Sequence, residues 1–214
     1  MKILAIESSS STLFLAIQNE KKIFHLKSKS INNTAKNINS MVDKILKNSK
    51  TNLNEIDAIA ISSGPGSFTS LRVGMSYAKG LSLTLDIPIV PISTFEILLF
   101  SNIDKVNGDT SVVIYSHGRT VYKCDYKINA NSYKLINEPN TFKIDELKKL
   151  QRNIIFKGSE KFFKEINNNN NKKNIIVELD IESLLKLSID NFKLLKTKSL
   201  DNLSPEYVGN FEIK

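Results

Sequence analysis

The 214-residue sequence contains one cysteine, no tryptophan and two histidines. A single thiol, Cys124, cannot form a disulfide within the chain, so an apolar core must stabilise the fold. The histidines, His25 and His117, lie in different halves of the sequence and do not form the helical His-pair motif of metalloenzymes. The composition therefore excludes a disulfide scaffold, and we assign no metal-ligating residue.

Long apolar runs are also missing. The longest apolar cluster, at residues 95–100, is interrupted by Glu96, whereas a membrane-spanning helix needs about 20 apolar residues. At the start of the chain, Glu7 comes before the apolar core of a signal peptide could form. These features predict a cytoplasmic protein that does not enter a membrane.

Positive charge is in excess but is not concentrated. Lysine and arginine number 30 against 22 acidic residues, which gives a net charge of +8. Arginine is scarce, and no basic block of the kind that follows a phosphate backbone stands out. A solvated lysine-rich surface explains the charge best. An RNA-binding module is the alternative, and it predicts that the isolated chain retains tRNA with a steep salt dependence.

The spacing of apolar residues predicts an α/β protein whose two halves repeat one order of elements. In the first half we expect strands at 2–7, 12–17, 22–27, 58–62 and 87–92, with helices at about 38–46, 67–85 and 93–101. In the second half we expect strands at 110–115, 120–126, 132–136, 153–156 and 174–179, with helices at 144–151, 159–166 and 181–195. The polar stretch 102–109 resembles a linker, which predicts domains at 1–104 and 105–214. The Asn-rich run 167–171 is expected to be an exposed loop.

A glycine-rich turn, Gly64-Pro65-Gly66-Ser67, separates a predicted buried strand from a predicted helix. Glycine permits close approach of the backbone, and a helix N-terminus favours an anion. The turn could therefore hold a phosphate or a carboxylate. It could equally be a tight strand-to-helix connection packed against its neighbours, which is the commoner use of such turns.

This turn and the residues after it resemble the TsaB (YeaZ) family, accessory subunits of bacterial tRNA threonylcarbamoyladenosine synthesis. The resemblance is carried by Gly64–Thr69, Leu71–Gly74 and Ala78–Leu81, by the opening Ile3–Ser9, by residues 56–61 and 89–94, and faintly by Ser204–Val208. It implies an actin-like ATPase fold of two ribonuclease-H-like lobes, each with a mixed β-sheet flanked by helices. It also implies anion- or nucleotide-facing turns, formed by Glu7, Ser8, Ser9, Gly64, Gly66 and Ser67.

Two departures from the family pattern bear on catalysis. Members usually begin with Asp-Thr-Ser or Asp-Thr-Ala, where this chain has Glu7-Ser8-Ser9, and the hairpin of the second lobe commonly opens with Asp-Ala-Arg, where this chain has residues 115–119 without an acid. An ATPase of this fold uses two opposed carboxylates to place magnesium and water. We therefore assign no catalytic residue. The alternatives left open are an independent ATPase or kinase of this fold and a metallopeptidase-like protein.

The resemblance implies a noncatalytic scaffold for threonylcarbamoyl transfer to the anticodon-adjacent adenosine of ANN-decoding tRNAs. Its partners would be the catalytic homologue TsaD, which it stabilises, the P-loop ATPase TsaE, and tRNA reached through the complex. The free chain would be a monomer or a homodimer. We assign it no cofactor of its own, and ATP or ADP could bind at the interface of the complex. Small and apolar side chains on two helices predict a partner-binding helical bundle formed by Ile38, Met41, Val42, Ile45, Leu71, Gly74, Met75, Ala78 and Ser82.

Overall fold

The computed structural model describes residues 1–20, 22–28, 33–130, 132–167 and 172–209. The chain divides into two compact units, one made of residues 1–94 with 180–206 and the other of residues 95–179 with the end of the chain. The expected division at residue 104 is thereby corrected, because residues 180–206 return to the first unit. Of the helices in the described part of the chain, none combines the length and the hydropathy that crossing a bilayer requires.

The first unit is built on a five-stranded sheet in the order β3-β2-β1-β4-β5. Its strands are β1 (Ile3–Glu7), β2 (Phe14–Asn19), β3 (Lys22–Lys27), β4 (Ala58–Gly64) and β5 (Ile89–Ser93). β1, β4 and β5 run parallel, whereas β2 and β3 are antiparallel to their neighbours. Every residue of β1 and β4 is buried, as expected for central strands covered on both faces.

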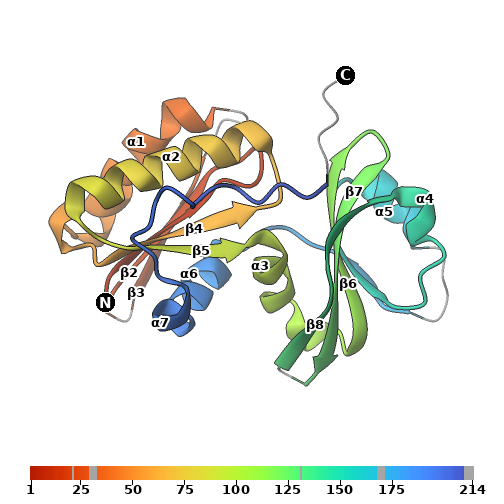
Figure 1. Cartoon of the computed structure of the whole chain (residues 1–214). Coiled ribbons are helices and arrows are strands. Elements are labelled where there is room, and N and C mark those ends of the chain that lie inside the picture. Colours follow the sequence, from red (N-terminus) through yellow and green to blue (C-terminus); the bar gives the residue numbers. More distant parts are fainter. Residues whose placement is uncertain (21, 29–32, 131, 168–171, 210–214) are drawn as a thin grey trace. The chain divides into compact units, whose positions relative to one another are not determined.

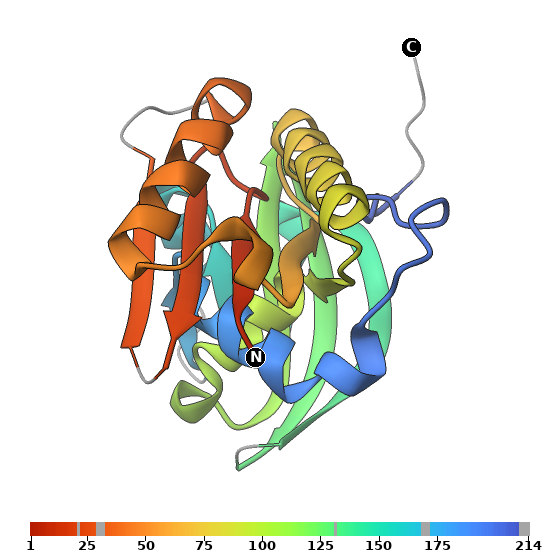
Figure 2. The same ribbon diagram turned by 90° about the vertical axis from the view of Figure 1, so that its left-hand side faces the viewer.

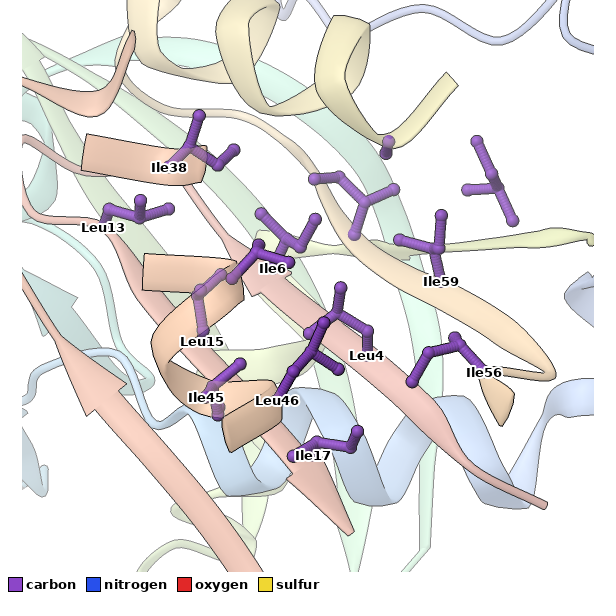
Figure 3. Close-up of a cluster of buried hydrophobic side chains, with 14 of the residues drawn as sticks. Leu4, Ile6, Leu13, Leu15, Ile17, Ile38, Ile45, Leu46, Ile56 and Ile59 are labelled. Atoms are coloured by element: carbon purple, nitrogen blue, oxygen red, sulfur yellow. The ribbon is translucent and has the colours of Figure 1, made fainter. Parts of the chain in front are cut away.

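Helices cover both faces of this sheet (Figures 1 and 2). α1 (Thr34–Ser49) and α2 (Phe68–Leu85) lie on one face, and α6 (Ile181–Asp190), followed by the short α7 (Phe192–Leu195), lies on the other. Figure 3 shows the core between α1 and the sheet, where Ile38, Ile45 and Leu46 meet side chains of β1 and β2. The apolar spacing of α1 therefore faces its own sheet.

The second unit repeats this topology. Its sheet has the order β10-β9-β6-β7-β8, and its strands are β6 (Gly108–His117), β7 (Thr120–Asn129), β8 (Ser132–Lys143), β9 (Asn153–Lys157) and β10 (Asn174–Ile176). Its helices are α3 (Thr94–Phe100), whose first residue is still assigned to the first unit, α4 (Ile144–Leu147) and α5 (Glu160–Ile166). In each unit an antiparallel meander is followed by two parallel strands, which confirms the predicted two-lobed, actin-like fold.

Several element boundaries differ from the sequence prediction. β8 extends to Lys143 instead of ending at residue 136, because it is an edge strand that pairs with β7 and tolerates Pro139. The expected helix 181–195 is interrupted at Asn191, whose backbone leaves helical geometry between α6 and α7. Most of the Asn-rich run, residues 168–171, lies outside the described residues.

Candidate functional site

The predicted nucleotide-facing turns meet at one edge of the first sheet. β1 and β4 are parallel neighbours, so the residues that follow them emerge side by side. The backbone N–H of Ser67 donates to the carbonyl oxygen of Ser9 at 2.7 Å. A Cβ atom built on Gly66 would lie only 2.1 Å from that same oxygen. The structure therefore brings the two turns into direct contact.

In this contact several of the groups that could bind an anion are used by the chain itself. Ser67 N–H is bonded to Ser9, and the N–H of Ser9 donates to Oε1 of the fully buried Glu7. The Ser67 hydroxyl pairs with that of Ser70 and makes no capping bond. Ser8 faces α2, since a Cβ atom on Gly74 would meet its Oγ at 2.1 Å. These contacts are those of a packed strand-to-helix turn, and nucleotide binding here stays a prediction.

Gly66→Ala tests this packing. The added methyl group would collide with the Ser9 backbone. Backbone atoms, unlike a side chain, cannot relieve the collision by changing rotamer. We expect a loss of about 1–3 kcal/mol in the free energy of unfolding, the usual cost of overpacking. Urea denaturation measures the loss, and Gly80→Ala on the same segment is the control because that site is open. Equal stability of Gly66→Ala and the wild type would contradict the contact.

A residue from the far end of the chain also reaches this edge. The Ser63 hydroxyl donates to Oε1 of Glu206 at 2.6 Å, and the backbone N–H of Glu206 donates to the Ser63 carbonyl at 2.7 Å. Sequence reasoning did not assign Glu206. The only signal was the faint family likeness at Ser204–Val208. No local sequence pattern links Glu206 to Ser63, because the two residues lie far apart in the chain.

The nine predicted partner-binding residues are nearly all buried. Only Met41 is half-buried; the buried residues are Ile38, Val42, Ile45, Leu71, Gly74, Met75, Ala78 and Ser82. This corrects the prediction for their side chains. The apolar stripe of each helix packs on its own sheet, so any partner must be met by other residues of α1 and α2.

The outward face of α2 has a distinct composition. Val73, Ser76, Gly80 and Leu83 recur at intervals of three and four and form one line along the helix, here named the α2 stripe. Val73 is half-buried and the other three are exposed, Leu83 at 73%. A Cβ atom on Gly80 would meet nothing within 4 Å. Small residues around an exposed leucine form a surface on which another helix can lie closely.

The second lobe's hairpin, which lacks the acid common in the family, carries Arg119. The Arg119 guanidinium binds Asp145 of α4 through two hydrogen bonds and Glu165 of α5 through a third. These bonds from Arg119, together with that from Lys148, lower the pKa of Asp145 to about 2. Arg119 therefore ties the hairpin to both helices. Within the described residues, no three His, Cys, Asp or Glu side chains cluster as a metal site would require.

His25 and Cys124 lie in different surroundings. His25 is exposed on β3, with Nδ1 3.3 Å from a carboxylate oxygen of Glu182. Cys124 is buried, and burial raises the pKa of its thiol to about 11. A thiol with that pKa is almost wholly protonated at neutral pH, and so it is a poor nucleophile.

A buried ionic cluster in the second unit was not predicted. Asp125 on β7 accepts hydrogen bonds from Ser111, Lys123 and Asn137, and Nη1 of Arg152 lies 3.1 Å from its Oδ2. The side chains of Asp125 and Lys123 are only 3% and 6% exposed. Burial opposes ionisation of Asp125, but the hydrogen bonds from Lys123, Ser111 and Asn137 outweigh it and lower the pKa of the carboxyl. Asp125 is therefore ionised at neutral pH.

Comparison with known proteins agrees with the resemblance read from the sequence. The family model of the tRNA N6-adenosine threonylcarbamoyltransferase TsaD matches residues 28–184. The "tRNA threonylcarbamoyladenosine biosynthesis protein TsaB" of Buchnera aphidicola (Acyrthosiphon pisum) is 36% identical over 131 residues, which cover 61% of this chain and 59% of the relative. The protein of the same name from Escherichia coli K12 is 33% identical over 134 residues, which cover 61% of this chain and 57% of that protein. The matched segments thus span less than two thirds of either relative.

A solved structure extends the likeness to the whole fold. "YeaZ from Pseudomonas aeruginosa" superposes with a TM-score of 0.78 over 96% of this chain and 100% of that chain, at 18% sequence identity. At this identity the match concerns the fold alone. It covers both repeated sheets, including the second half, where the sequence resemblance is weak.

Proposed function

The chain belongs to the TsaB (YeaZ) family and carries a TsaD-type domain, and on that basis we propose that it is an accessory subunit of tRNA threonylcarbamoyladenosine biosynthesis. The product would be the threonylcarbamoylated adenosine next to the anticodon of ANN-decoding tRNAs. The observation that carries the proposal is the 33–36% identity to proteins named for this biosynthesis.

In this proposal the subunit acts by binding and stabilising the catalytic homologue TsaD. The α2 stripe supports this role, because it leaves an apolar residue and an open glycine on the outward side of a helix whose other side packs into its own lobe. A partner can shift the conformational equilibrium of TsaD only by binding one of its conformations more tightly. A rigid helical surface suits that purpose. The same stripe would serve a second copy of this chain when TsaD is absent.

A noncatalytic role is supported by what the two turns do. Glu7 accepts a hydrogen bond from Ser9, and its turn packs against Gly66. In the second lobe, Arg119 binds Asp145 and Glu165 at the hairpin. Transfer of a phosphoryl group needs metal-holding and water-positioning groups on opposite sides of the nucleotide, and the described turns offer one buried acid and one paired cation. We propose that TsaE and tRNA join through the complex, with any ATP or ADP bound at its interface.

Light scattering of the purified chain, alone and mixed with the TsaD homologue, tests the proposed role. We expect a mixed pair that elutes as one species, and threonylcarbamoyl transfer to tRNA that requires both proteins. The chain alone should release no phosphate from ATP and magnesium. Robust turnover by the chain alone would instead favour the independent ATPase. Bound zinc or iron together with peptide cleavage would favour the metallopeptidase.

A further inference from the structure

The segment after α7 closes back over the first unit (dark blue in Figure 1). At residue 197 it forms an antiparallel bridge with β5, in which Thr197 and Ile89 exchange two backbone hydrogen bonds of 2.8 and 2.9 Å. Beside this bridge, Lys198 pairs with Asp86, just past the end of α2, at 2.8 Å. We name residues 197–206 the C-terminal clasp.

The middle and the tip of the clasp are also attached. Leu200 and Leu203 pack against the core cluster that includes Met75 and Ala78 of α2. At the tip, Glu206 exchanges two hydrogen bonds with Ser63 through its backbone N–H and its carboxylate. The clasp is therefore bound at the sheet edge, at the core cluster to which α2 contributes, and at the turn that precedes α2.

The tip contacts the point from which α2 starts. Gly64 has φ of +110°, and a Cβ atom there would lie 3.0 Å from the Glu206 carbonyl oxygen and 3.2 Å from Cδ1 of Leu71. Leu71 is on the first turn of α2, so the tip of the clasp and the beginning of the helix pack on the same glycine. The helix has 18 residues and spans about 27 Å. A tilt of about 5° at its start would move its far end by about 2 Å.

We propose that the C-terminal clasp sets the position of α2, with Glu206 as the positioning residue that holds the start of the helix. This inference rests on the proposed function in one respect, since it assigns the α2 stripe as the surface whose position matters. The clasp would control the positions of Gly80 and Leu83 although it is not part of the α2 stripe. The end of the chain thereby influences binding at a surface formed by another segment.

Hydrogen exchange of the free protein tests the positioning by itself. In Glu206→Ala we expect the backbone amides of residues 66–71 to exchange about tenfold faster than in the wild type, because the buried Ser63 hydroxyl loses its acceptor. Glu206→Gln keeps an oxygen acceptor and should retain most of the protection. Ser63→Ala removes only the donor and should behave like Glu206→Ala. Lys198→Ala, at the exposed outer end of the clasp, is the control and should leave these amides unchanged.

Titration of the same variants with the TsaD homologue tests the consequence. Glu206→Ala and Ser63→Ala should bind about three- to tenfold more weakly, and Glu206→Gln almost as tightly as the wild type. Unchanged exchange at residues 66–71 in both weakened variants would overturn the proposal, as would faster exchange with unchanged affinity. If the wild type fails to bind the homologue, the proposed function is wrong, while the exchange result still decides whether the clasp positions α2.

Discussion

Gly80→Glu is expected to lower the affinity for the TsaD homologue by at least about tenfold, or about 1.4 kcal/mol. Gly80 is the open point of the α2 stripe, and a carboxylate placed there would be desolvated without a partner when another helix packs on it. The fold itself should not suffer, because the glycine is exposed in a helix interior and glutamate is the better helix former. Calorimetric titration measures the affinity, and thermal melting verifies the fold.

Two variants control for size and charge. Gly80→Ala adds one methyl group and should raise the free energy of unfolding by roughly 1 kcal/mol with little effect on binding. Leu194→Glu adds the same negative charge at a site 81% exposed on α7, on the opposite face of the sheet, and should bind as the wild type does. If Gly80→Glu forms the complex with unchanged affinity, the α2 stripe is not the interface. Charge changes at Met75 or Ala78 would not answer the question, because both side chains are buried in the core and such variants would unfold.

Asp125→Ala is expected to cost about 3–5 kcal/mol in the free energy of unfolding, the usual result of breaking a buried ion pair from one side. Lys123 would be left at 6% exposure with no anion beside it, and Arg152 would lose the same carboxylate. Thermal or urea denaturation measures the loss. Asp109→Ala, at an exposed position on the neighbouring strand β6, should change stability by no more than about 0.5 kcal/mol.

The same cluster makes stability depend on pH with a definite sign. The pKa of Asp125 in the folded state lies below its ordinary value of 3.8. Its contribution is therefore fully present above that value and is lost as the pH falls through the folded-state pKa. Asp125→Asn should flatten this part of the acid denaturation curve.

Replacing both partners, Lys123→Met with Asp125→Leu, should recover much of the stability that Asp125→Ala loses. Equal stabilities of Asp125→Ala and the wild type would show that the ion pair does not hold the fold.

Much of the fold could be predicted from the sequence because its signals are local. The spacing of Ile38, Val42 and Ile45 indicates which face of α1 is buried. The continuous apolar run of β4 indicates a strand that is covered on both faces. One error lay within an expected element, the helix 181–195 that is interrupted at Asn191. Another lay at the end of β8, where pairing with β7 extends the strand beyond its apolar part. Pairing partners override local preference at such places.

The candidate site was only partly predictable. The family resemblance grouped the turns that contain Ser9 and Ser67, whereas the contact of Glu206 with Ser63 joins residues 143 positions apart. Asp125, Lys123 and Arg152 look like surface residues in the sequence. Only the pairing of β6 with β7 and β9 places them together in the interior.

The amino-acid sequence alone determined the order of the elements, because hydrophobic periodicity and turn residues act over a few neighbouring positions. Its motifs also indicated the family and the helices that carry the proposed partner surface. The tertiary structure decided which side of α2 is available. Gly74 and Gly80 are identical residues on one helix, yet a side chain at the first would strike Ser8 and at the second would meet open space. That difference depends on what packs against each glycine, and the packing neighbours come from distant parts of the chain.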